Sequence, residues 1–276
     1  MNAVEVENLK KVYVVHKRGG LFKTRSEVVS VDGVSFSVPA GQAVAFIGPN
    51  GAGKSTTIRM LTGILKPTSG DMHVLGFTPW KDRSKLAFHV GAVFGQRSQL
   101  WYHLPAGDTF DLLARVYNLD KGEYIKRRAM LVERFELGPF LDVPVRRLSL
   151  GQRMRAEVAA SLLHKPKLLL LDEPTIGLDI NARLRLRELI RQWNREEGLT
   201  VFLTSHDTGD IESVAERVIV INHGRIVLDD SVDNLRKQFS GWSLEDAIAH
   251  VYGLDYDHDD GSGGREPALG KEVMAS

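Results

Sequence analysis

Several features are missing from this 276-residue chain, and each absence narrows the classes of protein it can belong to. There is no cysteine, which excludes disulfides and thiolate metal sites and is compatible with a reducing compartment. No apolar run approaches the roughly 20 residues of a membrane-spanning helix, and the charged, alternating start differs from a signal peptide. We therefore expect a soluble chain that reaches a membrane only through a partner.

Net charge of one sign is also nearly absent. The 36 Lys and Arg residues almost balance the 35 Asp and Glu residues, which gives a formal net charge of +1. No overall positive field favours DNA or RNA, so we expect no nucleic-acid partner. The length and the 43% hydrophobic content suit one large globular domain or two small ones.

The first part of the chain has the alternation of β-strands. Residues 4–15 and 28–38 alternate apolar and polar side chains, and the basic stretch 16–27 between them is interpreted as an exposed turn. The stretch "QAVAFIG" (42–48) is mostly apolar, which predicts a short buried strand. A Gly-rich loop and a helix to about residue 64 follow it.

The middle of the chain changes to helical periodicity. Residues 96–163 carry apolar side chains at helical spacing with charge on the other face, which predicts a helical section inserted into an α/β chain. Strand and helix patterns then return, and residues 217–229 predict a hairpin around a His-Gly turn. Residues 255–276 are acidic and then rich in Gly and Ser, so we expect them to be disordered.

The stretch "GPNGAGKST" fits the phosphate-binding pattern G-x-x-x-x-G-K-[ST] between a buried strand and a helix. Its glycines let successive N–H groups surround a phosphate. Lys54 supplies positive charge for the β- and γ-phosphates, and Ser55 offers a hydroxyl to Mg²⁺. The candidate nucleotide-binding residues are Gly48, Pro49, Asn50, Gly51, Ala52, Gly53, Lys54, Ser55 and Thr56.

Two carboxylates end the apolar run "LLLLDEP". An acid at the exit of a buried strand reaches the edge where α/β sheets bind ligands, so Asp172 is a candidate Mg²⁺ ligand. Glu173 is a candidate general base for the attacking water. The alternative is an N-cap or a surface ion pair. Together with the Lys54 loop, the acids indicate a nucleoside triphosphatase, a class that still includes GTPases and kinases.

A third motif, "LSLGQ" at 148–152, lies upstream of the acid pair, and "GLD" follows that pair. In this order the motifs resemble the ATP-binding subunits of ABC transporters, over about residues 4–240. The resemblance implies an α/β fold with a P-loop NTPase core, in which helices flank a mixed β-sheet. It also implies an N-terminal antiparallel β section and a helical subdomain inserted at about 97–163. We expect an ABC ATPase domain over 1–240, and a C-terminal helix and tail over 241–276.

The same resemblance gives roles to residues outside the phosphate-binding loop. Tyr13 matches the aromatic residue that stacks on adenine, and Gln96 matches the glutamine that links Mg²⁺ and the attacking water to the helical section. Asp179 matches a loop that contacts the opposite subunit, and His206 matches the histidine that reaches the γ-phosphate. The alternatives are a core tyrosine, a loop amide and a core histidine.

The "LSLGQ" residues have a different implied partner. In the family, Ser149, Gly151 and Gln152 cap the γ-phosphate of ATP that a second subunit holds, so two chains pair head to tail around two ATP molecules. The second subunit is either a second copy or a paralogue. Leu150 stands where the commonest family pattern has glycine. The local alternative for Ser149 is a plain helix N-cap.

A finer resemblance concerns "FGQRSQLWYHLP", "LSLGQRMRAE" and "LDEPTIGLD", which are similar to bacterial ABC-2-type exporter ATPases. It implies ATP and Mg²⁺ as cofactors and ATP hydrolysis coupled to export through a separate multi-helix permease. The implied location is peripheral, at the cytoplasmic face of the membrane. Trp101, Tyr102 and Phe110 either contact that permease or pack within the helical section.

Two other functions belong to different classes. A non-transport ABC ATPase of translation or DNA repair is the first alternative. Such proteins usually carry two ATPase halves or a long coiled-coil insertion, and this chain has one half and no room for the insertion. A regulatory ATPase without turnover would be expected to lack Glu173 or His206, and both are present.

Overall fold

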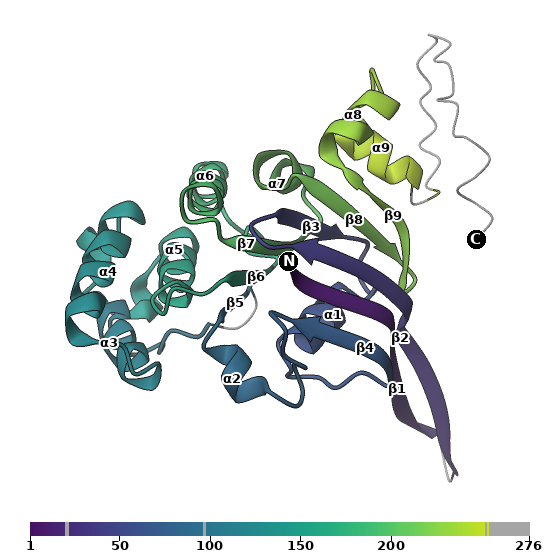
Figure 1. Cartoon of the computed structure of the whole chain (residues 1–276), viewed down its shortest axis with the longest axis horizontal. Helices are drawn as coiled ribbons and strands as arrows, with labels where there is room; N and C mark the ends of the chain where they lie inside the picture. Colours follow the sequence, from purple (N-terminus) through teal and green to yellow (C-terminus); the bar gives the residue numbers. More distant parts are fainter. Residues whose placement is uncertain (20–21, 96–97, 252, 254–276) are drawn as a thin grey trace.

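Two β-sheets and the helices around them make up the described chain (Figure 1). The computed structural model describes residues 1–19, 22–95, 98–251 and 253. The strands are β1 (Asn2–Gly19), β2 (Phe22–Pro39), β3 (Ala43–Ile47), β4 (Ser69–Val74), β5 (Val90–Phe94), β6 (Leu168–Asp172), β7 (Thr200–Ser205), β8 (Arg217–Asn222) and β9 (Arg225–Ser231). The helices are α1 (Lys54–Leu61), α2 (Arg83–Ala87), α3 (Ala106–Val116), α4 (Lys121–Arg134), α5 (Leu150–Ser161), α6 (Ile180–Glu197), α7 (Thr208–Val214), α8 (Val232–Gln238) and α9 (Leu244–Val251), with short 3₁₀ turns at Gly138–Phe140 and Val145–Arg147.

The larger sheet has the order β5-β6-β7-β3-β8-β9. Neighbouring strands from β5 to β8 are parallel, and β9 pairs antiparallel with β8. Because the carboxyl ends of parallel strands meet at one edge, the loops after β3, β5, β6 and β7 come together there. The fold therefore places the Lys54 loop and the acid pair side by side, and the expected mixed sheet is confirmed.

The central strands are apolar throughout because both of their faces are buried. In β6, Leu168 and Leu170 belong to the core that includes α1 and the smaller sheet, whereas Leu169 and Leu171 belong to the core that includes α5 and α6. A third core joins the far end of the sheet to α7, α8 and α9. Such two-sided burial explains the continuous leucine run that the sequence shows.

The smaller, antiparallel sheet has the order β2-β1-β4. It confirms the expected N-terminal β section, but the hairpin between β1 and β2 is longer than the sequence predicts. The expected turn over 16–27 is wrong: pairing continues through Val14↔Glu27 and His16↔Arg25 to Gly19↔Phe22. Figure 1 shows this ribbon extending away from the rest of the fold. A ribbon away from the core needs no apolar face, so its charged sequence lacks the alternation of a half-buried strand.

Helices fill the chain between β5 and β6, as the sequence predicts. Here α3, α4 and α5 pack around one apolar core, in which Phe110, Leu131 and Phe135 are fully buried. The predicted hairpin is also confirmed, with His223 and Gly224 at positive φ between β8 and β9. Gln96 and the acidic tail lie outside the described residues.

Candidate functional site

The Gly48–Thr56 loop joins β3 to the start of α1. Two of its glycines have no space for a side chain: a Cβ would lie 2.2 Å from the Ile221 carbonyl oxygen at Gly48 and 2.5 Å from the Ser30 carbonyl oxygen at Gly53. Gly53 also has φ +113° and caps α1 without a side-chain hydrogen bond. The free N–H groups at this helix start can therefore face an anion at close range.

Lys54 is the buried positive charge of the loop. Its side chain is 5% exposed, and its Nζ donates to the carbonyl oxygens of Gly48 (2.6 Å) and Pro49 (3.2 Å). The same Nζ lies 3.7 Å from Oε1 of Glu173. Burial lowers the pKa of Lys54, and the carboxylates of Glu173 and Asp172 oppose that shift. The loop thus holds an ammonium group beside the acid pair, where a phosphate chain needs it.

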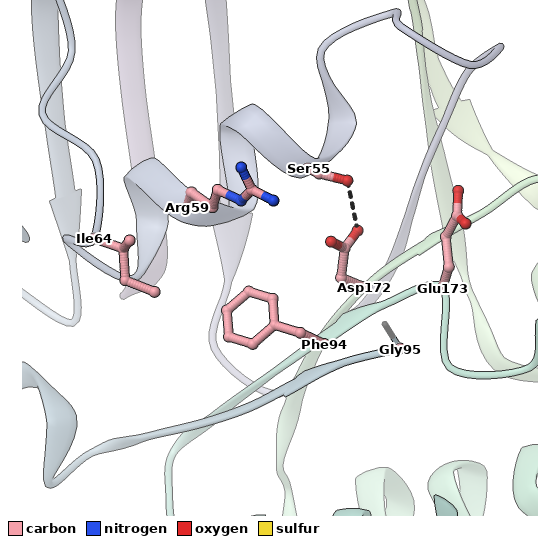
Figure 2. Close-up of a pocket in the computed structure, with 7 residues that line it drawn as sticks. All are labelled: Ser55, Arg59, Ile64, Phe94, Gly95, Asp172 and Glu173. Carbon is pink, nitrogen blue, oxygen red and sulfur yellow. Dashed lines mark hydrogen bonds between the residues drawn. The ribbon is translucent and has the colours of Figure 1, made fainter. Parts of the chain in front are cut away.

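Oxygen ligands gather around Asp172 at the end of β6. Its Oδ1 accepts from Ser55 Oγ at 3.1 Å and from Thr204 Oγ1 at 2.7 Å. Figure 2 shows Ser55 and Asp172 facing one another across the pocket that Arg59 and Glu173 also line. Hydroxyl and carboxylate oxygens are the donors that Mg²⁺ prefers. No described group of three or more His, Cys, Asp or Glu side chains is arranged to hold a metal, so an ion here would need phosphate oxygens and water as further ligands.

Glu173 has an unusual backbone conformation. Its φ is +53°, in the left-handed region that costs a non-glycine residue about 1–2 kcal/mol. Its N–H donates to the carbonyl oxygen and to Oγ1 of Thr204, both at 3.1 Å. Figure 2 shows the Asp172 carboxylate facing Ser55 and the Glu173 carboxylate lying apart from that pair. A Cβ at Gly95 would lie 2.6 Å from the Glu173 carbonyl oxygen, so the chain just before Gln96 packs directly against this strained residue.

His206 follows β7 and faces the same carboxylate. Its Nδ1 lies 3.8 Å from Oε1 of Glu173, and its side chain is 55% exposed. The alternative of a buried core histidine is therefore wrong. Lys54, Ser55, Asp172, Glu173 and His206 all meet at one edge of the sheet, as the sequence predicts.

The "LSLGQ" residues lie elsewhere, at the start of α5. Ser149 Oγ accepts from the Gln152 N–H at 3.2 Å, and Gln152 Oε1 accepts from the Ser149 N–H at 2.9 Å, which is a reciprocal capping box. The local alternative, an N-cap, is therefore present. It does not exclude the other role, because a hydroxyl that accepts one bond keeps its proton to donate. None of the described residues that line the pocket beside Ser55 comes from this segment.

The start of α5 lies beside the start of α6. A Cβ at Gly151 would be 2.6 Å from Ala182 Cβ, and a Cβ at Gly177 would be 3.1 Å from a Leu150 methyl carbon. Asp179 caps α6 by accepting from the Ala182 N–H at 2.9 Å, and it is exposed. The predicted site residues thus fall into two groups, one at the sheet edge and one at these helix starts.

The structure distinguishes the two interpretations given above for Tyr13 and for the three aromatic residues of the helical section. Tyr13 is half-buried on β1 opposite Val28, with Lys11 Nζ 5.4 Å from its ring centroid, so it is not a core residue. Trp101 and Tyr102 are about half exposed, whereas Phe110 is fully buried. Phe110 therefore packs within the helical section. Thr204 was not predicted from the sequence, although it binds both Asp172 and Glu173.

Comparison with known proteins identifies the class that this fold and site define. Residues 31–176 match the ABC transporter family. The chain is 33% identical over 238 residues to the linearmycin resistance ATP-binding protein LnrL of Bacillus subtilis, covering 86% of this chain and 72% of that protein. It is 36% identical to the Nod factor export ATP-binding protein I of Ralstonia nicotianae, covering 86% and 72%. A dimeric ATP-binding cassette in a post-hydrolysis state with ADP and phosphate superposes with a TM-score of 0.71 at 27% identity, covering 83% of this chain and 98% of that one.

The chain belongs to the ABC transporter family. It is an ATP-binding subunit that hydrolyses ATP, and it works with a second ATPase subunit and a separate membrane permease. None of the described helices has the length and apolar character needed to cross a bilayer.

Proposed function

We propose that the chain hydrolyses MgATP at its sheet edge to drive export through the permease. The observation that carries this proposal is the cluster around Asp172 and Glu173. Asp172 and Ser55 supply oxygen ligands that would hold Mg²⁺, which neutralises developing phosphate charge when bound. Lys54 and the N–H groups of residues 48–56 would bind the phosphates, and Tyr13 would stack on the adenine ring.

Glu173 is the proposed general base. Its Oε1 lies between Lys54 Nζ at 3.7 Å and His206 Nδ1 at 3.8 Å, so it can accept a proton from water while both neighbours contact the γ-phosphate. In our proposal Gln96 helps to orient that water and the Mg²⁺. The two carboxylates thereby have separate tasks, binding the metal and activating the water.

The second group of residues would act on the other subunit's nucleotide. Ser149, Gly151 and Gln152 would close over the γ-phosphate that the partner holds, and Asp179 would contact the partner near it. Each ATP then favours the closed dimer by its higher affinity for that state. Loss of the γ-phosphate as free phosphate removes the bridge and opens the dimer.

The names of the relatives support export. One of them is named for Nod factor export and another for linearmycin resistance. We propose that this chain also serves export, bound peripherally at the cytoplasmic face of the membrane, with Trp101 and Tyr102 in the contact with the permease.

Two measurements test this proposal. Turnover of the purified chain should require Mg²⁺ and ATP and should stop with EDTA. A tagged pull-down from detergent-solubilised membranes of the native host should recover one or two multi-helix membrane proteins in near-equal amounts. Recovery of ribosomal or DNA-repair proteins without a membrane protein would instead favour the non-transport alternative.

A further inference from the structure

Among the described members of the proposed catalytic cluster, His206 is the most exposed. Its side chain is 55% exposed, and its Nδ1 lies 3.8 Å from Oε1 of Glu173. A side chain with so little packing around it depends on its backbone for its position. The two residues that flank it, Ser205 and Asp207, are both held by hydrogen bonds from other parts of the chain.

Asp210 is the centre of the first set of these bonds. It is 1% exposed and lies in the first turn of α7, four residues after His206. Its Oδ2 accepts from Ser205 Oγ at 2.5 Å and from Thr175 Oγ1 at 2.6 Å, and its Oδ1 accepts from Arg187 Nε at 2.6 Å. One buried carboxylate therefore joins the end of β7, the loop that follows Glu173 and helix α6.

Asp207 is the centre of the second set. Its Oδ2 accepts from Arg183 Nη1 at 2.5 Å, and its Oδ1 lies 2.9 Å from Arg187 Nη2. Arg183 also donates from Nη2 to the Leu178 carbonyl oxygen at 3.3 Å, one residue before Asp179. Arg187 thus contacts both acids, and Arg183 extends the network to the loop that we propose meets the partner subunit.

We propose that the Arg187–Asp210 pair is a positioning element for ATP hydrolysis. It fixes the backbone on both sides of His206 and couples that backbone to the Asp179 loop, so that closing the dimer places His206 against the γ-phosphate. Neither residue touches nucleotide in this scheme. This inference depends on the role of His206 in the proposed function.

A positioning role and a purely structural role make different predictions for this pair. Replacing a buried ion pair by apolar residues of similar volume is often neutral or stabilising, so a pair that only held the fold together could be exchanged without cost. A misplacement of about 1 Å in a catalytic group, in contrast, can lower a rate about 100-fold. The two roles therefore predict different activities for a well-folded apolar replacement.

The experiment measures single-turnover ATP hydrolysis and ATP affinity for full-length variants. We expect Asp210→Asn to lower the hydrolysis rate about 10- to 100-fold with less than about a twofold change in ATP Kd. The double variant Arg187→Met with Asp210→Leu keeps the burial without the charges, but it leaves the Ser205 and Thr175 hydroxyls without their acceptor. It should therefore unfold at a somewhat lower temperature, and when assayed below that temperature, as a folded protein, it should remain slow. Asp229→Asn, which breaks the Arg217–Asp229 pair between β8 and β9, is the matched control and should hydrolyse ATP normally.

A double-mutant cycle tests whether the pair acts through His206. In a His206→Ala background, Asp210→Asn should cause less than about a twofold further loss, because the group that it positions is gone. A folded Asp210→Asn variant with an unchanged hydrolysis rate would overturn the inference, and so would a full rate in the Arg187→Met/Asp210→Leu variant. The inference would also fail if Asp210→Asn lowered the rate as much in the His206→Ala background as it does in the unaltered chain. Normal hydrolysis by His206→Ala itself would contradict the proposed role of His206. A slow His206→Ala beside a normal Asp210→Asn would overturn the positioning role alone.

Discussion

The two helix starts that we propose to bind phosphate differ in how many of their backbone N–H groups already have a partner within the chain. At α1, Gly53 provides no side-chain cap, and Lys54 is 5% exposed against the acid pair. At α5, Ser149 and Gln152 satisfy one another's backbone N–H groups and remain accessible. The start of α1 therefore has no side-chain cap to compete with a phosphate bound by its own chain. The start of α5 is already capped, and its exposed Ser149 hydroxyl is available to a partner.

This difference explains why one chain would need both. In our proposal a nucleotide in the Lys54 loop would contact the acid pair of the same chain, because β3, β6 and β7 end at the same edge. The Ser149 segment is absent from the described lining of that pocket. Its neighbour is instead the Asp179 loop at the start of α6. The comparison therefore predicts that the two starts complete one site only when two subunits meet.

The largest expected effect comes from removing the proposed base while both helix starts stay intact. Glu173→Gln should lower turnover by about 10²–10⁴, the usual contribution of general-base catalysis. ATP should still bind, because the amide leaves Lys54 and Asp172 in place. The variant should therefore accumulate as an ATP-bound dimer in size-exclusion chromatography with light scattering. Near-normal turnover, or a monomer at saturating ATP, would contradict the assignment.

The next prediction removes the charge from the first start. Hydrogen bonds to charged groups contribute about 1.5–3 kcal/mol each, so Lys54→Met should weaken ATP binding about 10- to 100-fold. Isothermal titration calorimetry measures this directly. Lys66→Met, on the loop that follows α1, is the control and should leave the affinity unchanged. Equal affinities for the Lys54 and Lys66 variants would show that the ammonium group does not bind phosphate.

The third prediction separates the two roles of Ser149. Aspartate is as good an N-cap as serine, so Ser149→Asp should keep the thermal stability of the chain. A carboxylate facing the partner's γ-phosphate adds like-charge repulsion, which costs several kcal/mol in an interface, so turnover should fall at least about tenfold. Ser231→Asp changes the equivalent N-cap of α8 and should affect neither quantity. Full activity of Ser149→Asp would leave Ser149 as a plain N-cap.

A mixing experiment tests the two-chain site itself. A dimer of one Lys54→Met chain with one Ser149→Asp chain contains one intact composite site, since each chain supplies the half that the other lacks. With random pairing, roughly a quarter of all sites are intact. Turnover of the mixture should therefore rise above that of either variant alone. Activity that stays at the mean of the two would mean either that both halves act within one chain or that the second subunit is a paralogue and not a second copy.

The two halves also differ in how well the sequence predicted them. The Lys54 loop and the acid pair are local motifs, and the structure places them together as expected. Thr204 could not be predicted from a local motif. Its contacts with Asp172 and Glu173 depend on the pairing of β7 with β6, which brings together residues far apart in the sequence. The same holds for Asp210, whose partners Thr175, Ser205 and Arg187 come from separate segments.

Local pattern also failed in the charged stretch between the first two strands. The β1–β2 ribbon continues through the charged stretch that we expected to be a turn, because strand periodicity reports one-sided burial and not pairing alone. The capping box at Ser149 is the opposite case. The local pattern offered an N-cap at Ser149 as the alternative, and the structure shows it with a reciprocal bond from Gln152, but these contacts within one chain say nothing of a partner's phosphate.

The smallest expected effect concerns the adenine, which neither helix start contacts. Stacking of a base on an aromatic ring contributes about 1–3 kcal/mol, and we expect the lower end for Tyr13 because it is only half-buried on β1. Tyr13→Ala should therefore weaken ATP binding about fivefold, whereas Tyr13→Phe keeps the ring and should bind normally. Tyr102→Ala removes an exposed tyrosine of the helical section and serves as the control. An equal loss in the Ala and Phe variants would mean that the hydroxyl, not the ring, contacts the nucleotide, and no loss in either would remove Tyr13 from the site.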